Sequence, residues 1–133
     1  MLKNLPYGLV LALLAAGVPT MSGHAQEKKV RDLRQKKLEH SHKILEGLAV
    51  NDFDKISQHA TDLILVSKVA EWQVFKTPKY EMFSNDFRRS AENLVLMAKA
   101  KNTDGAALAY VEMTLTCVKC HKYVREVRMA RAD

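Results

Sequence analysis

Both cysteines of this chain lie in one short segment near its C-terminal end, Cys117-Val118-Lys119-Cys120-His121. Cysteines three residues apart on a helix lie on nearly one face, so their thiols can bond to one edge of a flat partner. The C-x-x-C-H pattern attaches haem through two thioethers, and the histidine beside the second cysteine ligates the iron. The segment therefore predicts one covalent haem c, bound through Cys117 and Cys120, with His121 as the iron ligand.

Three other uses of paired cysteines fit the sequence less well. A thioredoxin-like dithiol lies at the start of a helix that follows a strand, whereas this pair lies deep inside a helical segment. A structural zinc site needs a second pair of cysteine or histidine ligands at similar spacing, which the sequence lacks. A disulfide between these cysteines would have poor geometry within a regular helix. Haem attachment is the interpretation that also uses His121.

Residues 1–25 have the pattern of a secretory signal peptide. Lys3 gives a positive start, Leu9–Ala16 form an apolar run, and Gly23 and Ala25 form a small-x-small cleavage site. An uncleaved membrane anchor is the alternative, but proline and glycine interrupt an apolar stretch shorter than the roughly 20 residues that span a bilayer. Because the thioethers of haem c form outside the cytoplasm, we expect an exported, periplasmic protein.

The remaining residues, 26–133, are enough for one domain. The whole chain of 133 residues is 47% hydrophobic and 27% charged, which is typical of a globular protein. Its formal net charge of +6 comes from basic residues scattered among acidic ones. This pattern favours solvated helix faces over a nucleic-acid surface.

Helical periodicity runs through nearly all of residues 26–133, with no alternating run long enough for a sheet. We expect four helices, at about 27–50, 51–67, 77–101 and 106–130, with Asn51 capping the second and Thr77-Pro78 starting the third. Short turns between such helices predict an all-α, antiparallel up-down-up-down four-helix bundle. On the first helix the predicted inward stripe is Val30, Leu33, Arg34, Leu38, Ser41, Leu45 and Leu48.

The position of the C-x-x-C-H segment in the last helix resembles the cytochrome c prime family, the class II c-type cytochromes. Ordinary class I cytochromes c have this motif near the N-terminus. Two further features support the resemblance, which covers residues 26–133: Arg125 follows His121 by four residues, and Arg34-Gln35 precede Leu38 by the family's spacing.

The resemblance implies roles for these residues. Arg125, and Arg34 or Gln35, would meet the haem propionates, and Leu38 would face the open side of the haem. Leucine cannot ligate iron, so a five-coordinate centre is implied. Alternatively, Leu38 is an ordinary core leucine, or His42 is a sixth ligand.

The other histidines are expected to be isolated. His40 and His42 point almost opposite ways on a helix, so they cannot chelate one metal together, and each is expected to be a lone surface histidine.

The leading functional hypothesis is an electron carrier that exchanges electrons with redox partner proteins. The alternative is a haem protein that binds or buffers nitric oxide or carbon monoxide at the open iron position. An enzyme such as a peroxidase would need acid–base residues near the iron, and Leu38 supplies none, so we expect no enzymatic activity. The family resemblance also implies a homodimer formed through the first two helices.

Overall fold

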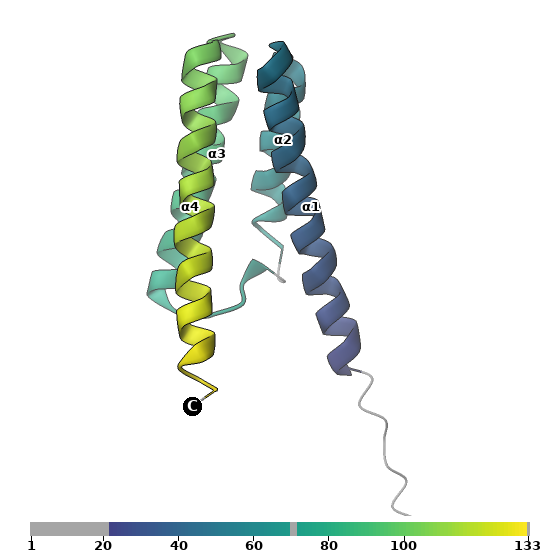
Figure 1. The fold of residues 1–133 in the computed structure, drawn as a ribbon, viewed down its shortest axis with the longest axis vertical. Helices are drawn as coiled ribbons and strands as arrows, with labels where there is room; N and C mark the ends of the chain where they lie inside the picture. Colours follow the sequence, from purple (N-terminus) through teal and green to yellow (C-terminus); the bar gives the residue numbers. More distant parts are fainter. Residues whose placement is uncertain (1–21, 70–71, 133) are drawn as a thin grey trace, which may run out of the picture.

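The computed structural model describes residues 22–69 and 72–132, and all regular structure within these ranges is helical. In chain order the helices are α1 (Ser22–Val50), α2 (Phe53–Val66), α3 (Pro78–Lys99) and α4 (Thr103–Met129). Figure 1 shows the four helices side by side along one long axis. The predicted all-helical four-helix bundle is confirmed.

The predicted signal peptide lies largely outside the described residues, which begin at Ser22. The expected cleavage point, after Ala25, falls in the exposed first turns of α1. Within the part of the chain that the structure describes, no helix is both long enough and apolar enough to cross a membrane.

Side-chain caps set the starts of α3 and α4. The Thr77 hydroxyl accepts a hydrogen bond from the backbone N–H of Tyr80 at 3.2 Å, and Pro78 occupies the first helical position. The Asn102 side chain accepts one from the backbone N–H of Gly105 at 2.9 Å. These bonds satisfy donors that the first turn of a helix leaves unpaired. The predicted start of α3 at Thr77-Pro78 is confirmed.

The turn between α1 and α2 differs from the prediction. Asn51 has a φ of 57°, in the left-handed region, and the Asp52 N–H donates to the Gly47 carbonyl at 2.9 Å. This is a Schellman ending of α1, so the side chain that caps α2 is Asp52, which accepts from the Lys55 N–H at 3.0 Å. The prediction of Asn51 as the cap was wrong because Asn51 ends the preceding helix.

The turn between α3 and α4 is built in the same way. Lys101 has a φ of 51°, and the Asn102 N–H donates to the Met97 carbonyl at 3.0 Å. The Thr103 hydroxyl donates to the side-chain oxygen of Asn51 at 3.0 Å. This bond joins the two short turns at one end of the bundle, the upper end in Figure 1.

The core lies mainly along α2 and α3. Both helices have neighbours on two sides, since α2 packs against α1 and α3, and α3 against α2 and α4. The buried residues of α2 are Ile56, Ala60 and Leu63, and those of α3 are Tyr80, Ser84, Phe87, Ala91, Leu94 and Ala98.

The predicted inward stripe of α1 is partly wrong. Leu38 and Leu45 are 50% and 52% exposed, whereas Ile44, outside the stripe, is completely buried. The reason is that α1 packs extensively on α2 but only sparsely on α4. In Figure 1, α1 and α4 diverge away from the turn end, so one side of α1 stays uncovered.

Candidate functional site

The predicted haem-attachment segment lies in the half of α4 that the bundle covers least. The fully buried residues of α4 end at Met113. Beyond them, Cys117 and Cys120 are half-buried free thiols, and His121 is exposed. The cysteines are three residues apart on a helix and therefore share a face of α4, as predicted.

Lys37 of α1 is the side chain that faces this cysteine pair. Its ammonium group lies close enough to both Cys117 and Cys120 to interact with them electrostatically. Its Nζ also lies 4.5 Å from the centre of the Trp72 ring. Burial at this position lowers the pKa of Lys37. The sequence did not single out Lys37, because no residue pattern reveals which α1 side chain meets α4.

Burial raises the pKa of the Cys117 thiol to about 11 and also raises that of Cys120. The nearby Lys37 ammonium acts in the opposite direction but does not offset burial. Both groups are therefore neutral thiols at pH 7. Redox-active C-x-x-C pairs depend on a lowered thiol pKa, so this environment speaks against thioredoxin-like chemistry.

Positive charges surround His121. Partial burial, together with the charges of Lys37, Arg125 and Arg34, lowers the pKa of the imidazole. The neutral imidazole is the form that ligates a metal. Arg34 and Arg125, singled out in the sequence for their spacing, thus lie within electrostatic range of His121, from α1 and α4 respectively. Arg128 also contributes, one turn after Arg125, and was not predicted.

The remaining predicted site residues lie on the exposed side of α1. Gln35 is exposed, and Leu38 is half exposed, so Leu38 is not an ordinary core leucine. His42 is exposed. His40 is not the lone surface histidine that we expected, because its ring lies against that of His59 on α2.

Trp72, in the connection between α2 and α3, packs beside Lys37. Trp72 is 8% exposed, and its indole N–H donates to the Ser84 hydroxyl at 2.9 Å. Its ring centre lies 5.0 Å from that of Phe87, and its carbonyl accepts the Tyr80 hydroxyl. The tryptophan therefore packs into the bundle and also covers the ammonium side chain nearest the thiols.

These residues fit a covalently bound haem. Two protonated thiols share a face of α4, a neutral histidine follows the second, and several cationic side chains stand near it to meet propionates. The group would lie between α1 and α4, which pack only sparsely against each other, beside Lys37.

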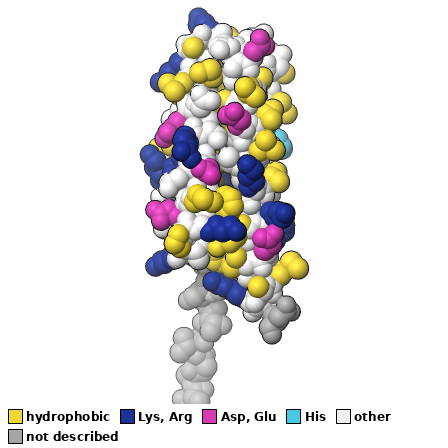
Figure 2. Space-filling view, turned by 90° about the vertical axis from the view of Figure 1, so that its left-hand side faces the viewer, with side chains coloured by type: hydrophobic (Ala, Val, Ile, Leu, Met, Phe, Trp, Pro, Cys, Tyr) yellow, Lys and Arg dark blue, Asp and Glu magenta, His cyan; other side chains and the backbone are white. Residues whose placement is uncertain are grey.

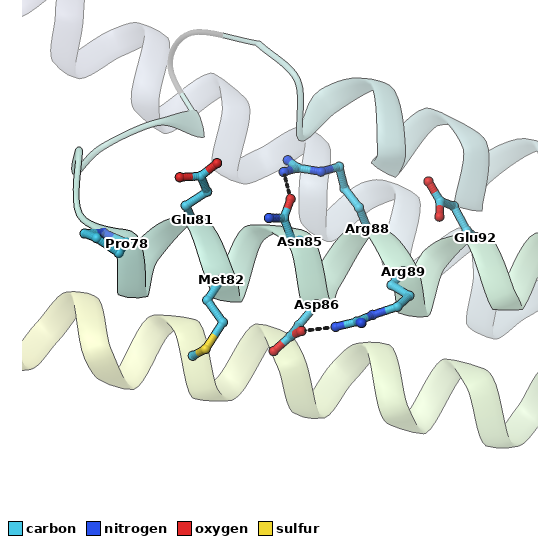
Figure 3. Close-up of a pocket in the computed structure, with 8 residues that line it drawn as sticks. All are labelled: Pro78, Glu81, Met82, Asn85, Asp86, Arg88, Arg89 and Glu92. Carbon is cyan, nitrogen blue, oxygen red and sulfur yellow. Dashed lines mark hydrogen bonds and ion pairs between the residues drawn. The ribbon is translucent and has the colours of Figure 1, made fainter.

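A surface depression lies elsewhere, along α3, and the residues that line it include no cysteine or histidine. Figure 3 shows that all eight of its labelled residues belong to this one helix. Two of the charged side chains are already paired, Arg88 with Asn85 at 2.5 Å and Arg89 with Asp86. On the face in Figure 2, basic, acidic and hydrophobic side chains are interspersed.

No family model matches this chain, and neither a curated protein nor a solved structure matches it. The interpretation of the site therefore depends on the residues of this chain and on their geometry.

Proposed function

We propose that this protein is an electron-transferring c-type cytochrome of the cytochrome c prime type, with one haem bound through Cys117 and Cys120 and ligated by His121. The observation that supports this proposal is the composition of one face of α4. Two free, half-buried thiols share that face, the histidine follows directly, and Lys37 of α1 lies within electrostatic range of both thiols.

The protonation state of the thiols suits the attachment chemistry. Each thiol would add across a vinyl group of the porphyrin, so that an S–C and a C–H bond would form while the S–H bond and the vinyl π bond would break. The addition needs no oxidant, because the thiol supplies both the sulfur and the hydrogen. A pKa of about 11 keeps that hydrogen on Cys117 at neutral pH.

The bound haem supplies a one-electron iron couple. The chain's own residues then have distinct tasks: His121 offers its imidazole to the iron, and Arg34 or Gln35, with Arg125, pairs with the propionates. The buried ring of Trp72 excludes water beside Lys37. Redox proteins are the proposed partners, and no enzymatic role is proposed.

The proposal includes an antiparallel, up-down-up-down order of the helices and export to the periplasm. Two Schellman turns that meet at one end of the bundle support this order. The pattern of residues 1–25 supports export, since haem c is assembled outside the cytoplasm. The resemblance adds a homodimer through α1 and α2.

A gas-binding role is the second candidate, and it depends on the side chains of α1. Leu38, at the position that the resemblance assigns to the open side, has no atom that ligates iron. Lys37 and His42 are α1 residues that could instead supply a sixth ligand, and Lys37 lies within electrostatic range of both thiols.

The test is to purify the protein from cells that assemble c-type cytochromes and to measure its mass and visible spectrum. We expect one haem that survives denaturation, and loss of covalent haem when Cys117→Ser and Cys120→Ser are combined. Lys119→Ala, an exposed position between the cysteines, is the matched control and should keep the haem. Protein purified from the periplasm without haem, and with both thiols free, would contradict the proposal.

Adding carbon monoxide to the reduced protein separates the two roles. A high-spin ferrous spectrum that changes on adding the gas would support the open site and gas binding. A low-spin spectrum indifferent to the gas would support a plain electron carrier with a sixth ligand. In that case Lys37→Ala, compared with His42→Ala, identifies the ligand, because only the correct variant becomes high-spin.

A further inference from the structure

A second group of metal-ligating side chains joins α1 to α2. His40 of α1 and His59 of α2 bring their Nδ1 atoms within 3.0 Å of each other. Asp62 lies on α2 three residues after His59, and its Oδ2 is 3.6 Å from each of those nitrogens. None of the three residues belongs to the proposed haem site.

We propose that His40, His59 and Asp62 bind one divalent transition-metal ion of the zinc type. A triangle with sides of 3.0, 3.6 and 3.6 Å has its centre about 2.0 Å from each corner. Zinc bonds to histidine nitrogen are about 2.0–2.1 Å long, and those to carboxylate oxygen about 2.0–2.2 Å. An ion near the centre would therefore reach all three donors with little movement of the helices.

The donor set selects the class of metal. Two imidazole nitrogens and one carboxylate oxygen suit zinc and its transition-metal neighbours, whereas magnesium and calcium prefer oxygen ligands. Three protein ligands also leave a fourth, tetrahedral position for water or another small ligand.

The burial of the three side chains suits a site that is ordered but accessible. His40, His59 and Asp62 are 19%, 20% and 34% exposed. The two rings are tilted by 41° rather than stacked, with centres 5.3 Å apart. Because each donor sits on a packed helix, the geometry is set before an ion arrives.

Without a metal, the same atoms need a proton. Two Nδ1 atoms 3.0 Å apart can approach this closely only if one of them donates a hydrogen to the other. When an ion binds, this hydrogen can move to Nε2 of the same ring, which leaves both Nδ1 lone pairs free for the ion, and the positive charge of the ion would attract the Asp62 carboxylate.

The test is calorimetric titration of the purified, chelator-treated protein with zinc. We expect one ion per chain, and binding weaker by about 100-fold or more in His40→Ala and His59→Ala, because even loss of an outer-shell partner weakens a metal site by about 10–100-fold. His42→Ala removes an exposed histidine two residues from His40 and is the matched control, with unchanged affinity expected. Magnesium should not bind.

A chain that lacks haem could also bind zinc at Cys117, Cys120 and His121. The titration is therefore repeated in the combined Cys117→Ser and Cys120→Ser variant, in which binding at His40, His59 and Asp62 should persist. Zinc should also raise the melting temperature of the wild type. The increase should be smaller in a folded Asp62→Asn variant. The proposal would be overturned if His40→Ala and Asp62→Asn bound zinc as tightly as the wild type does. It would also be overturned if the combined Cys117→Ser and Cys120→Ser variant bound no zinc.

Discussion

Ile44 and Leu45 are neighbours on α1 with opposite surroundings. Ile44 has no exposed surface, whereas Leu45 is 52% exposed. Full burial of such a side chain contributes about 1.5–3 kcal/mol, and removing it from a packed site also leaves a cavity. The hydrophobicity of the two residues is similar, so only the packing of α1 on α2 distinguishes their contributions to stability.

We expect Ile44→Ala to lower the free energy of unfolding by about 2–5 kcal/mol. Leu45→Ala, its matched control, should change it by no more than about 0.5 kcal/mol, as is usual for an exposed position. Urea unfolding followed by circular dichroism measures both. A larger loss for Leu45 than for Ile44 would show that α1 is rotated relative to the packing described above.

The same contrast explains which site residues could be predicted from the sequence. Cys117, Cys120 and His121 are adjacent in the chain, so their spacing alone indicates their chemistry. Lys37 lies within electrostatic range of the thiols, and His40 contacts His59, only because the helices pack against one another. Periodicity shows that a helix has a covered face but not which residue of another helix lies against it.

At the scale of elements, the two short turns show how helix ends are made without glycine. Asn51 and Lys101 both adopt the left-handed conformation that ends a helix, and glycine adopts it at the lowest cost. The hydrogen bond that the Asn51 side chain accepts from Thr103 offsets the cost of the left-handed conformation at Asn51. Lys101 is exposed, and its backbone alone closes the turn.

Lys101→Gly is therefore expected to stabilise the protein by about 0.5–1 kcal/mol, because the relief of left-handed strain exceeds the added entropy of the unfolded chain. Lys99→Gly removes the same charge two residues earlier, inside α3, and should destabilise by up to about 1 kcal/mol. Thermal unfolding of both variants gives the comparison. If both substitutions stabilised the protein, or both destabilised it, the left-handed conformation of Lys101 would be contradicted.

The helices themselves were largely predictable, since their caps and periodic faces are local properties. Thr77-Pro78 begins α3, and Val50 ends α1, as expected. The errors concern relations between elements: Asn51 belongs to the end of α1, and Leu38 and Leu45 lie on a side that α4 does not cover. A helix with one close neighbour buries a narrower stripe than its hydrophobic residues suggest.

At the scale of the whole molecule, packing is uneven. Helices that follow one another in the chain pack closely, but α1 and α4 meet sparsely and diverge away from the turns (Figure 1). The fully buried residues of α4 lie in its first half, whereas those of α2 and α3 extend along most of each helix. Local stability should follow this distribution of packing.

We therefore expect the slowest amide hydrogen exchange in the middle of α2 and α3. Exchange should be faster by at least about tenfold in the last turns of α4, after Val124, because a small difference in local opening free energy is enough for such a ratio. Mass spectrometry of peptides from exchanged protein measures this gradient. Equal protection along α4 would contradict it.

The sparse contact between the first and last helices has a consequence for the order of assembly. Nearly all close packing joins neighbours in the chain, and chains with such local contacts fold quickly. The turn end of the bundle can form while the second half of α4, with both thiols, remains reachable from solvent. Under the proposed function, folding would therefore not need to wait for the haem, which could be added to a bundle already built.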